Sequence, residues 1–198
     1  MTDAVIESRR GPGRPRSAEC DAAIMEATLV EYADAGFDGL SVDAVAARAG
    51  CSKATIYRRY PSKLDLVITA SRSVAEELAP ELAGPTLRDD LDEICWSLAR
   101  KLQHPLFGRV MAMVVGDATR HDDVRAMHSD LVRMRRQPCI EALQRAVERG
   151  EMRDGVDLDA AVDQLGGPLF YRHLVTRMPI DEAYVNELID SFIASYGV

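Results

Sequence analysis

The sequence predicts an all-α protein of about nine helices, in which a small N-terminal domain precedes a larger helical domain. Apolar residues recur three and four apart from about residue 18 to the C-terminus, and no stretch alternates apolar and polar residues as a strand does. Glycine, proline and helix-capping residues separate the helical stretches. With 198 residues, of which 47% are apolar, the chain is long enough to bury a sizeable core.

The first 17 residues do not share this pattern. They contain Gly11-Pro12-Gly13-Arg14-Pro15-Arg16, in which the prolines lack an amide donor and the glycines favour an open chain. Four arginines and no acid lie between residues 9 and 16. We therefore expect a disordered basic arm over residues 1–17.

Three helices with clear start and stop signals are expected after the arm. Gly36 ends the first, because glycine readily takes the left-handed conformation of a helix end. Ser41 and Ser52 are N-cap residues for the second and third, which stop at Gly50 and Pro61. The expected ranges are 18–35, 42–49 and 53–59.

Six further helices complete the prediction. Ser62 with Asp65 and Thr86 with Asp89 form capping-box patterns that open two of them. Pro138 is expected to kink the longest. The expected ranges are 62–79, 86–104, 106–117, 122–149 and 158–177, with a last helix from residue 181. The predicted organisation is the arm, an N-terminal domain over 18–62, a connecting helix over 63–84 and a larger domain over 85–198.

The distribution of charge gives the first indication of function. The net charge of −8 argues against nucleic acid as a partner of the chain taken as a whole. Residues 48–63, however, carry five basic residues and no acid, in addition to the basic arm. Two basic blocks on an acidic chain indicate local binding of nucleic acid.

The sequence lacks the signals of several other classes of protein. No uncharged stretch exceeds eight residues, whereas a membrane-spanning helix needs about 20, and no signal peptide is apparent. The four cysteines form no CxxC motif, so a zinc site or a disulfide framework is not expected. These observations predict a soluble cytoplasmic protein with no metal, cofactor or membrane partner.

The second and third helices are typical of a helix-turn-helix, because both are short and a tight turn at residues 50–52 joins them. Ile56 and Tyr60 share one face of the third helix, whereas Thr55 and Arg58 lie on the opposite face. A helix in the DNA major groove needs this arrangement of an apolar back and a polar front.

Residues 40–66 carry a resemblance to a known family. They read LSVDAVAARAGCSKATIYRRYPSKLDL and resemble the DNA-binding signature of TetR-family transcriptional regulators. The sequence departs from the family pattern at Cys51, where valine is common, and Tyr60 is one of several aromatic residues that occur at its position. Residues 166–172 and 178–181 also resemble the regulatory domain of one branch of that family.

The resemblance implies roles for individual residues. Lys53, Thr55 and Arg58 would face the groove or its walls, Tyr57 would contact a backbone phosphate, and Lys63 would hold another. The basic arm resembles a minor-groove arm of AT-hook type. The implied DNA-binding residues are Arg14, Arg16, Ser41, Arg48, Ser52, Lys53, Thr55, Tyr57, Arg58, Arg59 and Lys63.

Several of these residues also have simpler explanations. Ser41 and Ser52 can be helix caps alone, and Arg48 can be a solvated surface charge. Tyr60 fits the core better than a DNA contact, and the arm can be an ordinary disordered terminus.

For residues 85–198 the resemblance implies a domain that dimerises and senses a ligand. A dimer would place two recognition helices about 34–36 Å apart on a palindromic operator. The last two helices would pack against their symmetry mates. The candidate interface residues, for which a core role is equally expected, are Leu165, Leu169, Val185, Leu188, Ile189 and Phe192.

A pocket for a small-molecule effector is expected among helices five to eight, since methionine and aromatic side chains suit adaptable apolar sites. The candidate wall residues, each also explained by core packing, are Trp96, Phe107, Met111, Met134 and Phe170. Binding of the effector would release a homodimeric repressor from DNA.

The sequence leaves three alternative functions open. A redox sensor acting through Cys95 and Cys139 is the first. An enzyme or metal protein is disfavoured, because no catalytic motif is present and His121 and His128 lie about two helical turns apart. A nonspecific nucleoid binder is disfavoured by the acidic bulk of the chain.

Overall fold

The computed structural model of the chain describes residues 16–77, 80 and 82–198. Within these residues it is all-α and contains no strand, as the periodicity predicts. The elements are α1 (Arg16–Gly39), α2 (Val42–Arg48), α3 (Lys53–Arg59), α4 (Lys63–Glu77), α5 (Leu87–Gln103), α6 (Pro105–Ala118), α7 (Asp122–Glu148), α8 (Leu158–Phe170), the π-helical turn η1 (Tyr171–Thr176) and α9 (Glu182–Tyr196).

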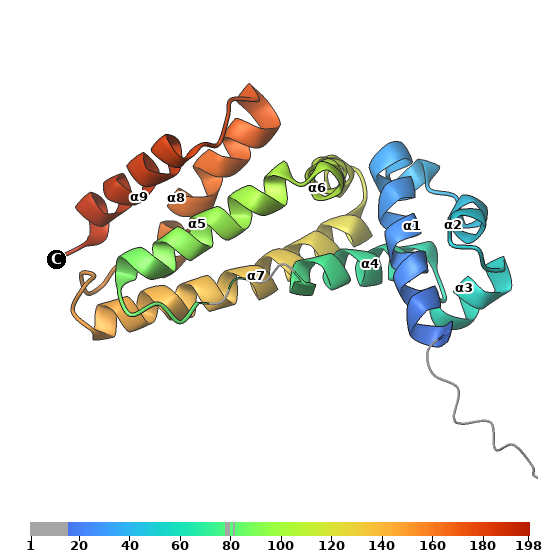
Figure 1. Cartoon of the computed structure of the whole chain (residues 1–198), viewed down its shortest axis with the longest axis horizontal. Coiled ribbons are helices and arrows are strands. Elements are labelled where there is room, and N and C mark those ends of the chain that lie inside the picture. Colours follow the sequence, from blue (N-terminus) through green and yellow to red (C-terminus); the bar gives the residue numbers. More distant parts are fainter. Residues whose placement is uncertain (1–15, 78–79, 81) are drawn as a thin grey trace, which may run out of the picture.

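The molecule is elongated, and α1, α2 and α3 form one end of it (Figure 1). α4 leads from this end to α7, and α5, α7, α8 and α9 extend toward the other end, where the C-terminus lies (Figure 1). α6 crosses between the two parts and is seen end-on in this view (Figure 1).

Two hydrophobic clusters hold the fold together. One joins α5, α7, α8 and α9, with Leu91, Leu143 and Ile189 fully buried. The other contains the apolar faces of α1–α4, but Val114 of α6 and Val124 of α7 also belong to it. The N-terminal domain therefore shares its core with the larger domain, and a displacement of α6 or α7 repacks the side chains beneath α1 and α4.

The helix starts follow the sequence signals. Thr86 and Asp89 form a complete capping box at α5, and Ser62 and Asp65 exchange hydrogen bonds in the same way at α4. Asp181 caps α9 through the Tyr184 N–H group. The predicted starts of these three helices are confirmed.

α1 and α7 follow the prediction in part. α1 begins at Arg16, so the last two residues assigned to the arm are helical, while residues 1–15 lie outside the described residues. Gly36 ends the regular part of α1, as predicted, because its φ of 67° and ψ of −173° are not helical, and one further turn follows to Gly39. α7 continues through Pro138 as one helix, and a bend at that residue stays a prediction.

Candidate nucleic-acid interface and ligand cavities

The helix-turn-helix is built by two capping serines and one glycine. The Ser41 Oγ atom accepts a hydrogen bond from the Ala44 N–H group (3.3 Å), and the Ser52 Oγ atom accepts one from the Thr55 N–H group (3.1 Å). Gly50 takes the left-handed conformation, with φ 65°, that turns the chain between the helices. Both serines therefore accept hydrogen bonds from free N–H groups at the starts of α2 and α3. This is the capping role that the sequence predicts for them independently of DNA binding.

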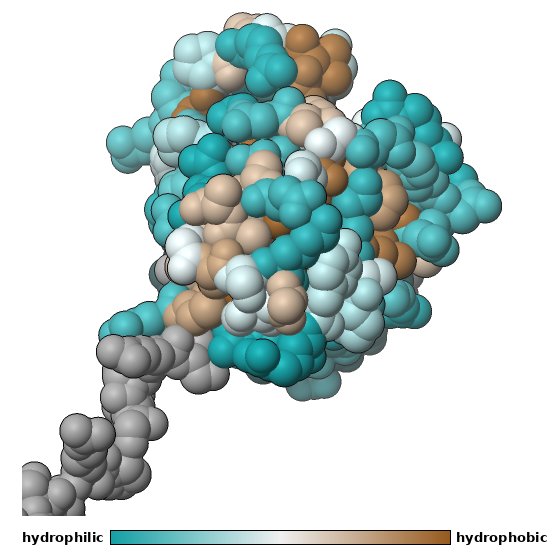
Figure 2. Space-filling model, turned by 90° about the vertical axis from the view of Figure 1, so that its right-hand side faces the viewer, coloured by the Kyte–Doolittle hydropathy of each residue, from teal (hydrophilic) through white to brown (hydrophobic). Residues whose placement is uncertain are grey.

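The outer face of α3 is exposed and hydrophilic. Ile56 is buried in the core behind it, whereas Tyr57 is 44% exposed and Arg58 is exposed. Among the described residues, neither Tyr57 nor Arg58 has a hydrogen-bond or ion-pair partner. Figure 2 views this end of the molecule and shows a mainly hydrophilic surface with scattered paler residues. Thr55 is half-buried beside Ser52, with their hydroxyl oxygens 2.9 Å apart.

Three of the predicted DNA-binding cations contact acids of the same domain. These pairs are Arg48–Glu31 at 3.1 Å, Lys53–Asp43 at 2.8 Å and Arg59–Asp21 at 2.5 Å. The pairs of Arg48 and Lys53 are exposed and contribute about 1 kcal/mol or less each, so a phosphate can displace the carboxylate there, whereas the Arg59–Asp21 pair is partly buried. The Arg58 side chain, by contrast, pairs with no acid of the described residues.

Lys63 is positioned by the segment that follows the kink of α1. Its Nζ atom donates to the Asp38 carbonyl oxygen at 3.3 Å and lies 4.9 Å from the centre of the Phe37 ring. The Asp38 carboxylate is 3.1 Å from the His121 Nε2 atom, and the Phe37 N–H group donates to the Asp117 carboxylate at 2.7 Å. These contacts connect Lys63, which the family resemblance predicts to bind a DNA phosphate, with the segment between α6 and α7 in the larger domain.

Asp117 anchors this connection from within the core. It is 1% exposed, and besides Phe37 it binds the Arg120 guanidinium. Burial by itself would raise the pKa of Asp117, but the hydrogen bonds from Phe37 and Arg120 favour the charged form, and the net pKa is lowered. Burial and the charge of Asp117 together raise the pKa of the neighbouring Tyr32.

Of the two arginines predicted to bind in the minor groove, only Arg16 lies within the described residues. Arg14 lies outside the described residues, and Arg16 is the first residue of α1.

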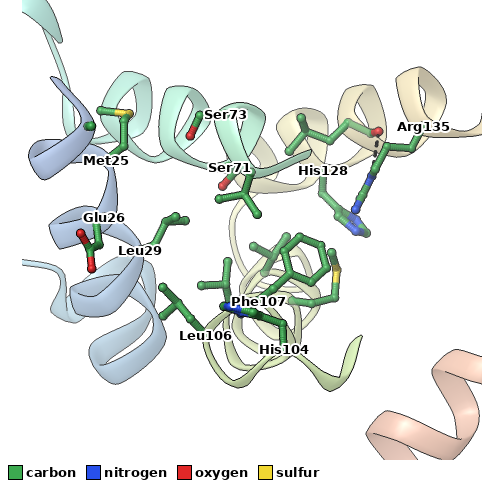
Figure 3. Close-up of a pocket in the computed structure, with 16 residues that line it drawn as sticks. Met25, Glu26, Leu29, Ser71, Ser73, His104, Leu106, Phe107, His128 and Arg135 are labelled. Carbon is green, nitrogen blue, oxygen red and sulfur yellow. Dashed lines mark hydrogen bonds between the residues drawn. The ribbon is translucent and has the colours of Figure 1, made fainter. Parts of the chain in front are cut away.

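A large cavity lies between α1 and α4 on one side and α6 and α7 on the other. It has a volume of about 480 Å³ and is lined by residues of α1, α4, α6 and α7, including Met25, Leu29 and Phe107. His128 and Arg135 lie side by side at the α7 side of it (Figure 3). A drug-sized ligand pocket has this volume and this mixture of apolar walls and few polar groups.

The second cavity, of about 400 Å³, lies between α5, α7 and α8. Phe170, Leu98 and Val162 contribute apolar walls, and Lys101 and Arg135 contribute positive charge. Arg135 lines both cavities and so stands at the boundary between them.

The five predicted wall residues do not share one cavity. Phe107 and Met111 line the first and Phe170 lines the second. Trp96 lines neither, being half-buried against the core, and Met134 lines neither, being 47% exposed. The sequence missed α1 and α4 as walls, because periodicity marks buried faces without showing which helices surround a void.

The six residues predicted for a dimer interface lie in or against the core of the single chain. Five of its six residues are buried within this chain and the sixth, Leu188, is half-buried against the same core. Side chains already buried in one protomer offer no surface to a second. The five buried residues are Leu165, Leu169, Val185, Ile189 and Phe192.

The two cysteines of the redox alternative are buried. Burial raises the pKa of Cys95 to about 12 and also raises the pKa of Cys139, so both are neutral thiols at neutral pH. This argues against an oxidant sensor at these positions. Within the described residues, no group of three metal-ligating side chains comes together, and no helix is long and apolar enough to cross a membrane.

Comparison with known proteins agrees with this architecture. The model of bacterial regulatory proteins of the tetR family matches residues 24–70, and the model of the tetracyclin repressor-like C-terminal domain matches residues 84–192. The HTH-type transcriptional regulator Rv1556 of Mycobacterium tuberculosis is 34% identical, over 92% of this chain and 88% of the relative. The DNA-binding transcriptional repressor TetR of Mycobacteroides abscessus is 30% identical, over 91% of this chain and 93% of the relative.

Solved structures share the fold. The TetR family transcription regulator SCO0332 superimposes with a TM-score of 0.70 at 27% identity, covering 89% of this chain and 97% of that one. A transcriptional regulator from Saccharomonospora viridis, solved with choline, superimposes with a TM-score of 0.66 at 18% identity, covering 92% of this chain and 100% of that one. The capped helix-turn-helix, the all-helical second domain and these matches show that the chain belongs to the TetR family of DNA-binding transcriptional regulators.

Proposed function

We propose that this regulator is a repressor that binds a palindromic operator as a homodimer and releases it when a small molecule binds. The observation that carries the proposal is the unpaired outer face of α3, where Tyr57 and Arg58 stand exposed on a helix whose other side is buried. An exposed aromatic and guanidinium pair suits phosphate and base-edge contacts in a major groove. A relative named a repressor supports the direction of control.

Dimerisation is assigned to the exposed surface of α8 and η1 in place of the buried residues. Tyr171, Val175 and Met178 are 58%, 64% and 52% exposed, and Gly167 is exposed on the preceding turns of α8. Apolar side chains gathered on an exposed surface mark a site of protein association. A second copy of this surface, related by a two-fold axis, would cover it.

Replacing Val175 with aspartate is therefore expected to weaken dimerisation at least tenfold. Two-fold symmetry brings the new charge near its own copy and desolvates it in both protomers. Sedimentation velocity over a range of concentrations measures the change. Val115→Asp, at an exposed valine of α6, is the matched control. A Val175→Asp chain that sediments like the wild type would show that the interface lies elsewhere.

Ligand release is supported by the position of the larger cavity. Its walls come from α1 and α4 on one side and from α6 and α7 on the other, so a molecule bound there touches both domains. The choline complex of the Saccharomonospora viridis protein shows that this fold accommodates a small organic molecule. Differential binding to two arrangements of the domains would couple the cavity to DNA affinity.

Fluorescence anisotropy with the gene's own upstream region tests the proposal. We expect that duplex to bind about a thousandfold more tightly than a shuffled duplex, and both affinities to fall as salt rises. Equal affinity for upstream, neighbouring intergenic and shuffled duplexes would overturn the proposal, because only the phosphate backbone would then be recognised.

A further inference from the structure

Lys101 and Arg135 face the cavity between α5, α7 and α8, where the one acid among the described lining residues, Asp163, pairs with a third lining cation, Arg136. Lys101 of α5 is only 7% exposed, and Arg135 of α7 is half-buried opposite it. Burial, with the nearby charge of Arg135 as the next cause, lowers the pKa of Lys101 to about 8. Burial also lowers the pKa of Arg135, so the fold places both cations in an unfavourable environment.

No described side chain balances these charges. The Lys101 Nζ atom has no hydrogen-bond or ion-pair partner among the side chains of residues 18–74, 80 and 82–198. Arg135 donates its Nε–H to the Leu131 carbonyl oxygen at 3.2 Å and contacts no carboxylate of those residues. The acids nearest to this cluster have other partners: Asp163 binds Arg136, and Glu93 binds Arg100.

The surroundings of the two cations also point to an organic ligand. Cys139, beside Lys101, has a pKa raised by burial and supplies no negative charge at neutral pH. The pKa of His128, next to Arg135 (Figure 3), is lowered by burial and by Arg135. The rest of the cavity wall is mainly apolar. Buried charge without a counter-ion is unfavourable, and a ligand that supplies one is bound correspondingly well.

We propose that this cavity binds a small organic acid, whose carboxylate lies between Lys101 and Arg135 and whose apolar body fills the remaining space. The planar guanidinium suits a carboxylate because it donates two parallel hydrogen bonds, and the ammonium of Lys101 adds a third donor. The inference rests on the proposed function, since the acid is the effector that this regulator senses. Because Arg135 also lines the cavity beneath α1 and α4, the head group acts at the boundary of both cavities.

Calorimetry on the chain without DNA tests the charge preference with three probes that share a ten-carbon tail. These are decanoate, decanol and decyltrimethylammonium. We expect decanoate to bind at least tenfold more tightly than decanol, and the cation not to bind. The affinity for decanoate is expected to fall as the pH rises from 7 to 9.5, because Lys101 loses its proton near pH 8.

Two variants and one control locate the head group. Lys101→Met and Arg135→Met are each expected to lower decanoate affinity at least tenfold while leaving decanol binding unchanged, which shows that the cavity is still folded. Lys101→Met is also expected to unfold at a higher temperature than the wild type without ligand, because it removes an unpaired buried charge. Arg88→Met, which removes an exposed charge from the same helix and leaves Glu93 paired with Arg100, should change neither affinity.

The proposal fails if decanoate binds no more tightly than decanol, or if Arg88→Met weakens decanoate binding as much as Lys101→Met does. Operator binding by the same proteins is measured separately, so this failure leaves DNA recognition standing. If decanoate binds through Lys101 but leaves operator affinity unchanged, the acid site is supported and the effector role is overturned, because coupling must be reciprocal.

Discussion

Replacing Arg58 with alanine is expected to lower operator affinity about a hundredfold. Arg58 is the exposed guanidinium of α3 that no described acid neutralises. A bidentate contact of arginine with a base contributes about 1–3 kcal/mol, and a dimer loses one such contact in each half-site. A combined loss of about 3 kcal/mol corresponds to a hundredfold change in the dissociation constant. Fluorescence anisotropy on operator and shuffled duplexes measures it.

Arg133→Ala is the matched control for this prediction. Arg133 lies on α7, outside the helix-turn-helix, and pairs with Asp130, so its removal costs one weak ion pair and little DNA affinity. Affinity for shuffled DNA should change less than operator affinity in Arg58→Ala, because a base contact carries sequence information and a phosphate contact does not. Equal losses in the two variants would refute the assignment of Arg58 to the groove.

Replacing Asp117 with alanine is expected to lower the free energy of unfolding by about 3 kcal/mol. The substitution leaves the Phe37 N–H group without its acceptor and removes the partner of Arg120. Losing a buried, charged acceptor has a cost of this order. The loss also frees Phe37, over whose ring Lys63 lies, so operator affinity should fall as well. Denaturant unfolding followed by circular dichroism measures the first effect.

The pH dependence of stability separates Asp117 from an ordinary surface acid. Its pKa is lowered in the folded chain, so its stabilisation is present above the ordinary carboxyl pKa and disappears as the pH falls through the lowered value. Wild-type protein should therefore lose more stability below about pH 4 than Asp117→Ala does. Asp130→Ala, which breaks an exposed pair with Arg133, should cost less than about 0.5 kcal/mol. Identical acid unfolding of wild type and Asp117→Ala would contradict this account.

Local signals in the sequence were sufficient to locate the helices. Ser41, Ser52, Thr86 and Asp181 all cap the helices that follow them, because a cap depends on contacts within one turn of chain. The apolar back of α3, with Ile56 buried, also follows from spacing alone. The family resemblance then connected this local pattern with DNA.

Features that depend on distant contacts were not predictable in this way. Ile189 and Phe192 have the apolar spacing of a buried face, but spacing does not distinguish burial within a chain from burial between two copies. Gly36 ends the regular part of α1 as the sequence predicts, but its distant partner had no local signal. The Asp117 carboxylate, 81 residues later, accepts a hydrogen bond from the next N–H group, that of Phe37.

Two charged residues of the larger domain, Lys101 and Asp117, had a weaker signal in the sequence. Lys101 follows Ile94 by seven residues and so falls on the buried face of α5, where a charge is out of place. Asp117 likewise ends an apolar run in α6. Both charges are visible in the sequence, whereas the cavity beside Lys101 and the partners of Asp117 depend on residues far away in the chain.

Selection of duplexes from a random-sequence pool tests the central claim, that two copies of α3 read a symmetric site. The purified chain should enrich an inverted repeat whose half-site centres lie about one helical turn, or a multiple of it, apart. The Arg58→Ala chain should fail to enrich that repeat from the same pool. Enrichment of an inverted repeat would establish sequence-specific recognition by a symmetric pair. A pool that stays unenriched, or yields only a single unrepeated half-site, would contradict the account.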